Sequence, residues 1–90
     1  VFPSKIKIWC KKIYSYYDFF YSNNFIEKNM YHLIRIRSIV ERYKVTGSFS
    51  LELSNDVKEW IAKFKAAPDK KLYKNELKAA LDYFKKEAEA

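Results

Sequence analysis

Apolar side chains recur at steps of three and four residues through most of this 90-residue sequence. Such steps return to the same face of an α-helix, so the pattern is typical of amphipathic helices. It predicts four helices, over about residues 4–21, 24–44, 54–66 and 69–87. A chain of this length usually forms one domain. We therefore expect an all-α fold, a compact four-helix bundle in a single domain.

Short polar residues at the borders of these segments indicate where the helices begin and end. Asn24 followed by Glu27 has the spacing of a capping box, which would start the second helix. Gly47 suits the left-handed turn that ends a helix. Ser54 and Asp69 can cap the third and fourth helices through their side-chain oxygens. The last six residues, KKEAEA, are polar, and we expect this end of the fourth helix to fray.

The segment between the second and third helices alternates apolar and polar residues. Phe49, Leu51 and Leu53 alternate with Ser50 and Glu52, which by itself is a strand pattern. No second segment has such a pattern, and a lone strand leaves its backbone N–H and C=O groups without partners. We therefore expect an extended or short helical linker that holds these three apolar side chains against the bundle.

The formal net charge is +7, and the excess lies in the first half of the chain. Residues 1–44 carry nine Lys and Arg against three Asp and Glu, together with eleven of the seventeen aromatic residues. Basic and aromatic residues together favour an acidic protein partner or a nucleic acid, and a plain solvated basic face is the alternative. The candidate basic patch comprises Lys5, Lys7, Lys11, Lys12, Arg35 and Arg37.

Few residues have the types and spacing that catalysis or metal binding needs. His32 is the only histidine, and no further histidine or cysteine stands at ligand spacing from it, so we expect no metal. A single glycine cannot make a glycine-rich phosphate loop, and no carboxylate pair suggests acid–base chemistry. We therefore expect a non-enzymatic protein without a cofactor. The lone Cys10 forms no internal disulfide, which favours a reducing, intracellular location.

Two further features concern the chain as a whole. No run of 18 apolar residues is present, so we expect no membrane span. The sequence starts at Val1, not at methionine, and we expect it to be part of a longer or processed chain.

From Met30 onward, the order of elements is similar to that of a known family. The segments that carry the similarity are MYHLIRIRSIVERYKVT (30–46), LSNDVKEWIAKFKAAPD (53–69) and LYKNELKAALDYFKK (72–86). Together they resemble the N-terminal domain of transcription elongation factor TFIIS, a family that includes integrase-binding domains. The family's hinge is matched by Val45 and Thr46, and the apolar residue before its third helix is matched by Leu51. The valine and basic stretch of the third helix are matched by Val57, Lys63 and Lys65, and the closing aromatic residue and lysine are matched by Phe84 and Lys85. The glycine that usually precedes the third helix is absent, and Phe84 replaces a tryptophan.

The resemblance implies a compact helical bundle in the nucleus that docks short, disordered segments of transcription or chromatin proteins. In the integrase-binding relatives, partners bind the loops at one end of the bundle. These loops correspond here to Phe25 and Ile26 before the second helix, and to Pro68 and Leu72 before the last one. An exposed Phe25 would be the anchor, since a few such side chains dominate many interfaces. Neighbouring lysines and arginines would favour acidic, hydrophobic partner segments.

Two other functions stay open on the sequence. The basic first half could bind nucleic acid, with an affinity that falls steeply as the salt concentration rises. The chain could also be a small accessory subunit of a larger complex, because the aromatic residues of the first helix exceed one helix face and would be covered by neighbours. These residues are Tyr14, Tyr16, Tyr17, Phe19, Phe20 and Tyr21.

Overall fold

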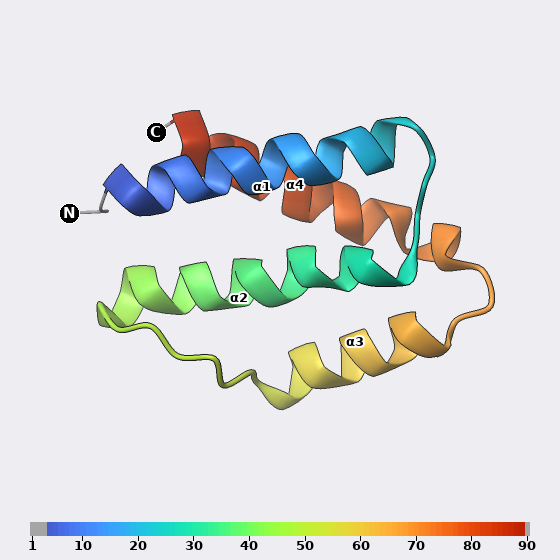
Figure 1. Cartoon of the computed structure of the whole chain (residues 1–90). Coiled ribbons are helices and arrows are strands. Elements are labelled where there is room, and N and C mark those ends of the chain that lie inside the picture. Colours follow the sequence, from blue (N-terminus) through green and yellow to red (C-terminus); the bar gives the residue numbers. More distant parts are fainter. Residues whose placement is uncertain (1–3, 90) are drawn as a thin grey trace.

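The computed structural model describes residues 4–89, which form four α-helices and two short 3-10 turns (Figure 1). The helices are α1 (Ser4–Ser22), α2 (Tyr31–Thr46), α3 (Asn55–Ala66) and α4 (Lys74–Glu89). The 3-10 turns η1 (Lys28–Met30) and η2 (Lys70–Tyr73) lead directly into α2 and α4. Successive helices run in opposite directions, and residues 4–89 contain no strand. The predicted all-α four-helix bundle is confirmed.

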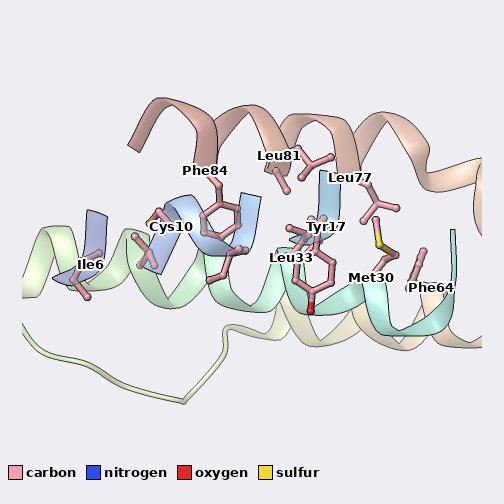
Figure 2. Close-up of a cluster of buried hydrophobic side chains, with 13 residues drawn as sticks. Ile6, Cys10, Tyr17, Met30, Leu33, Phe64, Leu77, Leu81 and Phe84 are labelled. Carbon is pink, nitrogen blue, oxygen red and sulfur yellow. The ribbon is translucent and has the colours of Figure 1, made fainter. Parts of the chain in front are cut away.

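The core is built by side chains from all four helices (Figure 2). Helix α4 packs against both α1 and α2, and α2 packs in turn against α3, so α2 and α4 are the central helices. The largest fully buried side chains are Cys10, Met30, Leu33, Val40, Phe64, Leu77, Leu81 and Phe84. Each buried Leu, Val, Met or Phe stabilises the fold by about 1.5–3 kcal/mol relative to an exposed one.

The predicted capping box at Asn24 and Glu27 is wrong, because Asn24 belongs to the end of α1. Asn24 has φ +61°, in the left-handed region that asparagine tolerates better than most residues. Its N–H donates to the carbonyl oxygen of Tyr21 at 3.1 Å, and the N–H of Phe25 donates to that of Phe20 at 2.8 Å. These two bonds form a Schellman motif. Glu27 makes no side-chain capping bond, and the second helix starts only after the turn η1.

Gly47 and Ser54 stand where the sequence predicts them, at the two ends of the linker between α2 and α3. Gly47 has φ +77°, and its N–H donates to the carbonyl oxygen of Tyr43 at 2.8 Å. The Ser54 hydroxyl accepts a hydrogen bond from the N–H of Val57 at 3.4 Å, which caps α3. Both helix boundaries are local features, which is why short sequence signals suffice to find them.

The linker is held by Arg42 as well as by its apolar residues. The Arg42 guanidinium donates to the carbonyl oxygen of Glu52 at 2.8 Å, which ties the linker to α2. Phe49 stacks on the Tyr43 ring, with the two centroids 4.4 Å apart. Leu51, however, is 73% exposed, so the prediction that all three apolar linker residues pack on the bundle is wrong at this position.

The described part of the tail predicted to fray is helical to Glu89, which contradicts the prediction for residues 85–89; Ala90 lies outside the described residues. Glu87 is only 9% exposed, and its Oε1 accepts a charge-assisted hydrogen bond from Lys44 Nζ on α2 at 2.5 Å. This ion pair holds the last turns of α4 against α2. The local sequence cannot reveal it, because its two partners are 43 residues apart.

Candidate functional site

The two predicted binding loops lie at the same end of the bundle (Figure 1). Lys74 connects them, because its Nζ donates to Asn24 Oδ1 at 3.3 Å and lies 5.2 Å from the centroid of the Tyr21 ring. We call this surface, residues 23–28 and 67–74, the loop end. The alternating direction of the helices brings these two segments together.

Three of the four predicted partner-binding residues are exposed at the loop end. Phe25 is 51% exposed and Leu72 is 74% exposed, and Pro68 is exposed as well. Ile26 is different, because it is half-buried and packs against the core. Ile26 therefore anchors its loop to the bundle, while Phe25 and Leu72 expose apolar surface.

Leu72 lies in the 3-10 turn η2, which precedes α4. The Asp69 carboxylate accepts a hydrogen bond from the N–H of Lys71 at 3.0 Å, and the N–H of Leu72 donates to the Asp69 carbonyl oxygen at 3.4 Å. Asp69 thus caps η2, and the predicted start of the fourth helix at this residue is wrong. The helix proper begins at Lys74.

Three rings, which we call the aromatic cluster, hold η2 against α3. Trp60 stacks on Phe64 with centroids 5.2 Å apart, and Tyr73 meets each of these rings edge-on at 5.6 Å. Phe64 is fully buried. Because Tyr73 follows Leu72 directly, the aromatic cluster also fixes the backbone from which Leu72 projects.

Lysines outnumber acidic residues at the loop end. Its charged residues are Lys28, Lys70, Lys71 and Lys74 against Glu27 and Asp69. Lys70 Nζ donates to the carbonyl oxygens of Ala67 at 2.9 Å and of Lys65 at 3.4 Å, at the C-terminus of α3 where a cation is favourable. The two exposed apolar side chains therefore lie in a surface of net positive charge.

The six residues of the predicted basic patch lie on two helices. Lys5, Lys7, Lys11 and Lys12 are exposed along α1. Arg35 and Arg37 are half-buried on α2, and they line two different grooves. The lysines and the arginines thus present their charge on separate surfaces.

A groove between α2 and α3 combines apolar and cationic side chains. It has a volume of about 360 Å³, and we call it the basic groove. The apolar side chains that line it are Tyr31, Leu53, Ile61 and Ala62, and the cationic ones are Arg35, Lys58 and Lys65. Within the part of the chain that the structure describes, no acidic side chain lines it.

His32 lies beside the basic groove, and the charge of the groove affects the pKa of its imidazole. Its ring is 4.1 Å from the Tyr31 ring, and Lys65 Nζ is 4.3 Å from the Tyr31 centroid. Burial lowers the pKa of His32 below its ordinary value, and the positive charges of Arg35 and Lys65 lower it further. The imidazole is therefore neutral at physiological pH and can report on charge that enters the groove.

A second groove lies between α2, α3 and α4 and carries both signs of charge. It has a volume of about 300 Å³, and we call it the mixed groove. Its charged side chains are Arg37, Asp56 and Glu76, and Arg37 also pairs with Glu41 on its own helix at 3.6 Å. The mixed groove therefore has two acidic side chains against one cationic one, in contrast to the basic groove.

Reactive side chains are scarce in the described structure. Cys10 is fully buried, and burial raises the pKa of its thiol to about 11, so the thiol stays protonated and unreactive at neutral pH. The Tyr83 hydroxyl is buried and has no hydrogen-bond partner among residues 4–89. Over the same residues, no three His, Cys, Asp or Glu side chains gather as metal ligands would, and no helix has the length and apolar character of a membrane span.

Several exposed apolar side chains lie away from the loop end, and of these the sequence singles out only Tyr16 and Phe19, as rings that exceed one helix face. Ile8, Tyr16 and Phe19 are exposed on α1, and Val45, Phe49 and Leu51 are exposed around the linker. Ile8 and Phe19 are three helical turns apart and so share one face, which the spacing alone could have revealed. A neighbouring protein could cover this face, as the accessory-subunit alternative expects.

Comparisons of this chain with known protein families, curated proteins and solved structures gave no match.

Proposed function

We propose that this chain is a non-enzymatic protein-interaction module that docks short acidic, hydrophobic segments of partner proteins at the loop end. One observation carries the proposal: Phe25 and Leu72 are exposed in adjoining loops, and Lys74 ties these loops together. Apolar anchors surrounded by charge of one sign select a partner with apolar side chains and the opposite charge.

The shape of the loop end supports this proposal, because the surface is held without a partner. A Schellman motif fixes the chain at Asn24 and Phe25, and the aromatic cluster fixes η2. A surface that is already ordered loses little conformational freedom on binding. The ordering cost therefore falls on the flexible partner segment, which suits a module that binds several short sequences.

The decisive test compares two exposed phenylalanines at opposite ends of the bundle. Fluorescence anisotropy would measure the binding of a labelled peptide that alternates Glu or Asp with Leu or Phe. Phe25→Ala should weaken binding by about 1 kcal/mol or more, roughly fivefold. Phe49→Ala is the matched control, since Phe49 is 55% exposed but lies in the linker at the other end. Equal effects of the two substitutions, or no effect of Phe25→Ala, would contradict the proposed site.

We further propose that the partner segments belong to transcription or chromatin proteins and that the chain acts in the nucleus. The support for this step is the resemblance of residues 30–86 to the N-terminal domain family of TFIIS. Crosslinking in cells that carry the tagged full-length protein should recover nuclear transcription or chromatin proteins. Recovery confined to another compartment would remove this part of the proposal.

Nucleic-acid binding is the second candidate function, and the four exposed lysines of α1 favour it. A nucleic-acid complex would lose affinity steeply as salt rises, because phosphate contacts release counterions. Labelled duplex and single-stranded oligonucleotides, titrated at low and at moderate salt, test this. Absence of binding at low salt would dispose of the candidate, and loss of binding in Lys7→Glu with retention in Phe25→Ala would favour it.

A further inference from the structure

The basic groove has a geometry that suits an added helix. On α2, Tyr31 and Arg35 are four residues apart, and on α3, Lys58, Ile61 and Lys65 follow at steps of three and four. Residues at these steps form rows along a helix, and a further helix packs into the groove between two such rows. The groove therefore offers an elongated surface, not a closed pocket for a small molecule.

The charged side chains of α3 set the spacing of the complementary groups. Lys58 and Lys65 are seven residues apart, which is two turns or about 10 Å along the helix axis. Ile61 lies between them, and Arg35 faces the same groove from α2. A ligand that matches these positions has carboxylates two turns apart with apolar side chains between them.

We propose that the basic groove is a second docking site, which takes an acidic amphipathic helix from a partner protein. Carboxylates at positions i and i+7 of that helix pair with Lys58 and Lys65, and apolar side chains at i+3 and i+4 contact Ile61 and Leu53. Charge complementarity commits the groove to this occupant, since three cations and no acid line it in the described structure. The site is separate from the loop end and does not require Phe25.

The groove suits an acidic helix better than a nucleic acid. Protein sites for single strands offer open aromatic faces on which bases stack. Among residues 4–89 one aromatic ring, that of Tyr31, lines this groove, and it already has an imidazole 4.1 Å and an ammonium group 4.3 Å from its centroid. A base would have to displace one of these groups, whereas a carboxylate would only join the cations.

The test is an NMR titration of the whole isotope-labelled chain with a designed peptide of about 14 residues, or four helical turns. The probe carries Glu at i and i+7 and Leu at i+3 and i+4, and a scrambled peptide of the same composition is its control. The probe should shift the amide signals of Arg35, Lys58 and Ile61. It should also raise the pKa of His32, because bound carboxylates offset the charges of Arg35 and Lys65 that depress it.

Two double charge-reversal variants change the net charge of the protein by the same amount. Comparing them distinguishes binding at the basic groove from attraction by the overall charge. The double variant Lys58→Glu/Lys65→Glu should weaken the probe about tenfold or more. Lys7→Glu/Lys11→Glu on α1 should leave the affinity unchanged, since all four lysines are exposed and only the first pair lines the groove. Phe25→Ala should leave the affinity that is measured from the groove signals unchanged, which distinguishes this site from the loop end.

Several results would overturn the proposal. In the first, the amide signals of the groove residues do not shift even at about 1 mM peptide, a concentration at which weak specific binding is detectable. Another is equal weakening by the two double variants, which would mean that net charge alone attracts the peptide. A third is an oligonucleotide that shifts the groove signals where the peptide does not. Circular dichroism of each variant verifies that the bundle is intact, so that a loss of binding reports on the groove.

Discussion

Replacing Tyr73 by leucine tests whether the aromatic cluster holds the loop end in place. Tyr73 meets the Trp60 ring at 5.6 Å and 78°, and the Phe64 ring at 5.6 Å and 81°, so both contacts have the favourable edge-on geometry. Leucine keeps an apolar side chain at this position but removes both ring contacts. Tyr73→Phe is the matched control, since it keeps the ring and loses only the hydroxyl.

The expected loss of stability follows from these two contacts. An edge-on aromatic pair contributes about 0.5–1.5 kcal/mol beyond the area that it buries, so two pairs contribute about 1–3 kcal/mol. Leucine recovers most of the buried area, because Tyr73 is only half-buried. We therefore expect Tyr73→Leu to lower the free energy of unfolding by about 2 kcal/mol, while Tyr73→Phe changes it by less than about 0.5 kcal/mol. A domain of this size has about 5–10 kcal/mol in total, so the loss is a large fraction.

Urea denaturation followed by circular dichroism measures this change. The midpoint should shift with the slope unchanged, because the substitution alters stability and not the extent of the core. Tyr73→Leu should also weaken peptide binding at the loop end, since Leu72 then projects from a less ordered turn. If Tyr73→Leu is as stable as the unmodified chain, the cluster does not hold η2. The loop end would then not be ordered before a partner binds.

Two further predictions concern the polar side chains buried around α4. Tyr83→Phe should raise the free energy of unfolding by about 0.5–1 kcal/mol, because it removes a buried hydroxyl that lacks a hydrogen-bond partner among the described residues. Thermal or urea denaturation measures this change, and a loss of stability would show that the hydroxyl does have a hydrogen-bond partner. Lys44→Met should lower the free energy of unfolding by about 1–3 kcal/mol, because it leaves the Glu87 carboxylate unpaired at 11% side-chain exposure. Glu87→Gln should lower it clearly less, because the Lys44 side chain is 43% exposed to water. The reverse order of these two losses would contradict the pairing.

The helices and two of their boundaries follow from the sequence because local features determine them. The three- and four-residue spacing of apolar residues requires only that one face be buried. Gly47 and Ser54 act within one turn of their own positions, through a left-handed φ of +77° and a hydrogen bond of 3.4 Å. Signals of this kind need no knowledge of the rest of the chain, and they gave correct predictions.

The errors arise where two local signals compete or where a distant residue decides. Asn24 is equally suitable before a helix and at the left-handed position that ends one. In the structure its N–H donates to a carbonyl oxygen of α1, so it ends that helix. Residues 85–90 look like a fraying tail, yet Lys44 is 43 residues away and pairs with Glu87. Asp69 does cap a helical turn, but the turn is a 3-10 segment whose existence the apolar spacing does not reveal.

The two candidate surfaces differ in how far a sequence can reveal them, and the reason is topological. Four helices that alternate in direction must bring the first and third connections to one end, so the placement of the segments around Phe25 and Leu72 at the same end follows from the number and direction of the helices. The basic groove depends instead on how α2 and α3 are rotated about their axes. A rotation of one residue step, about 100°, would send Arg35 and Lys65 to different faces. The rotation is set by the whole core, so the groove could be found only once that core was in place.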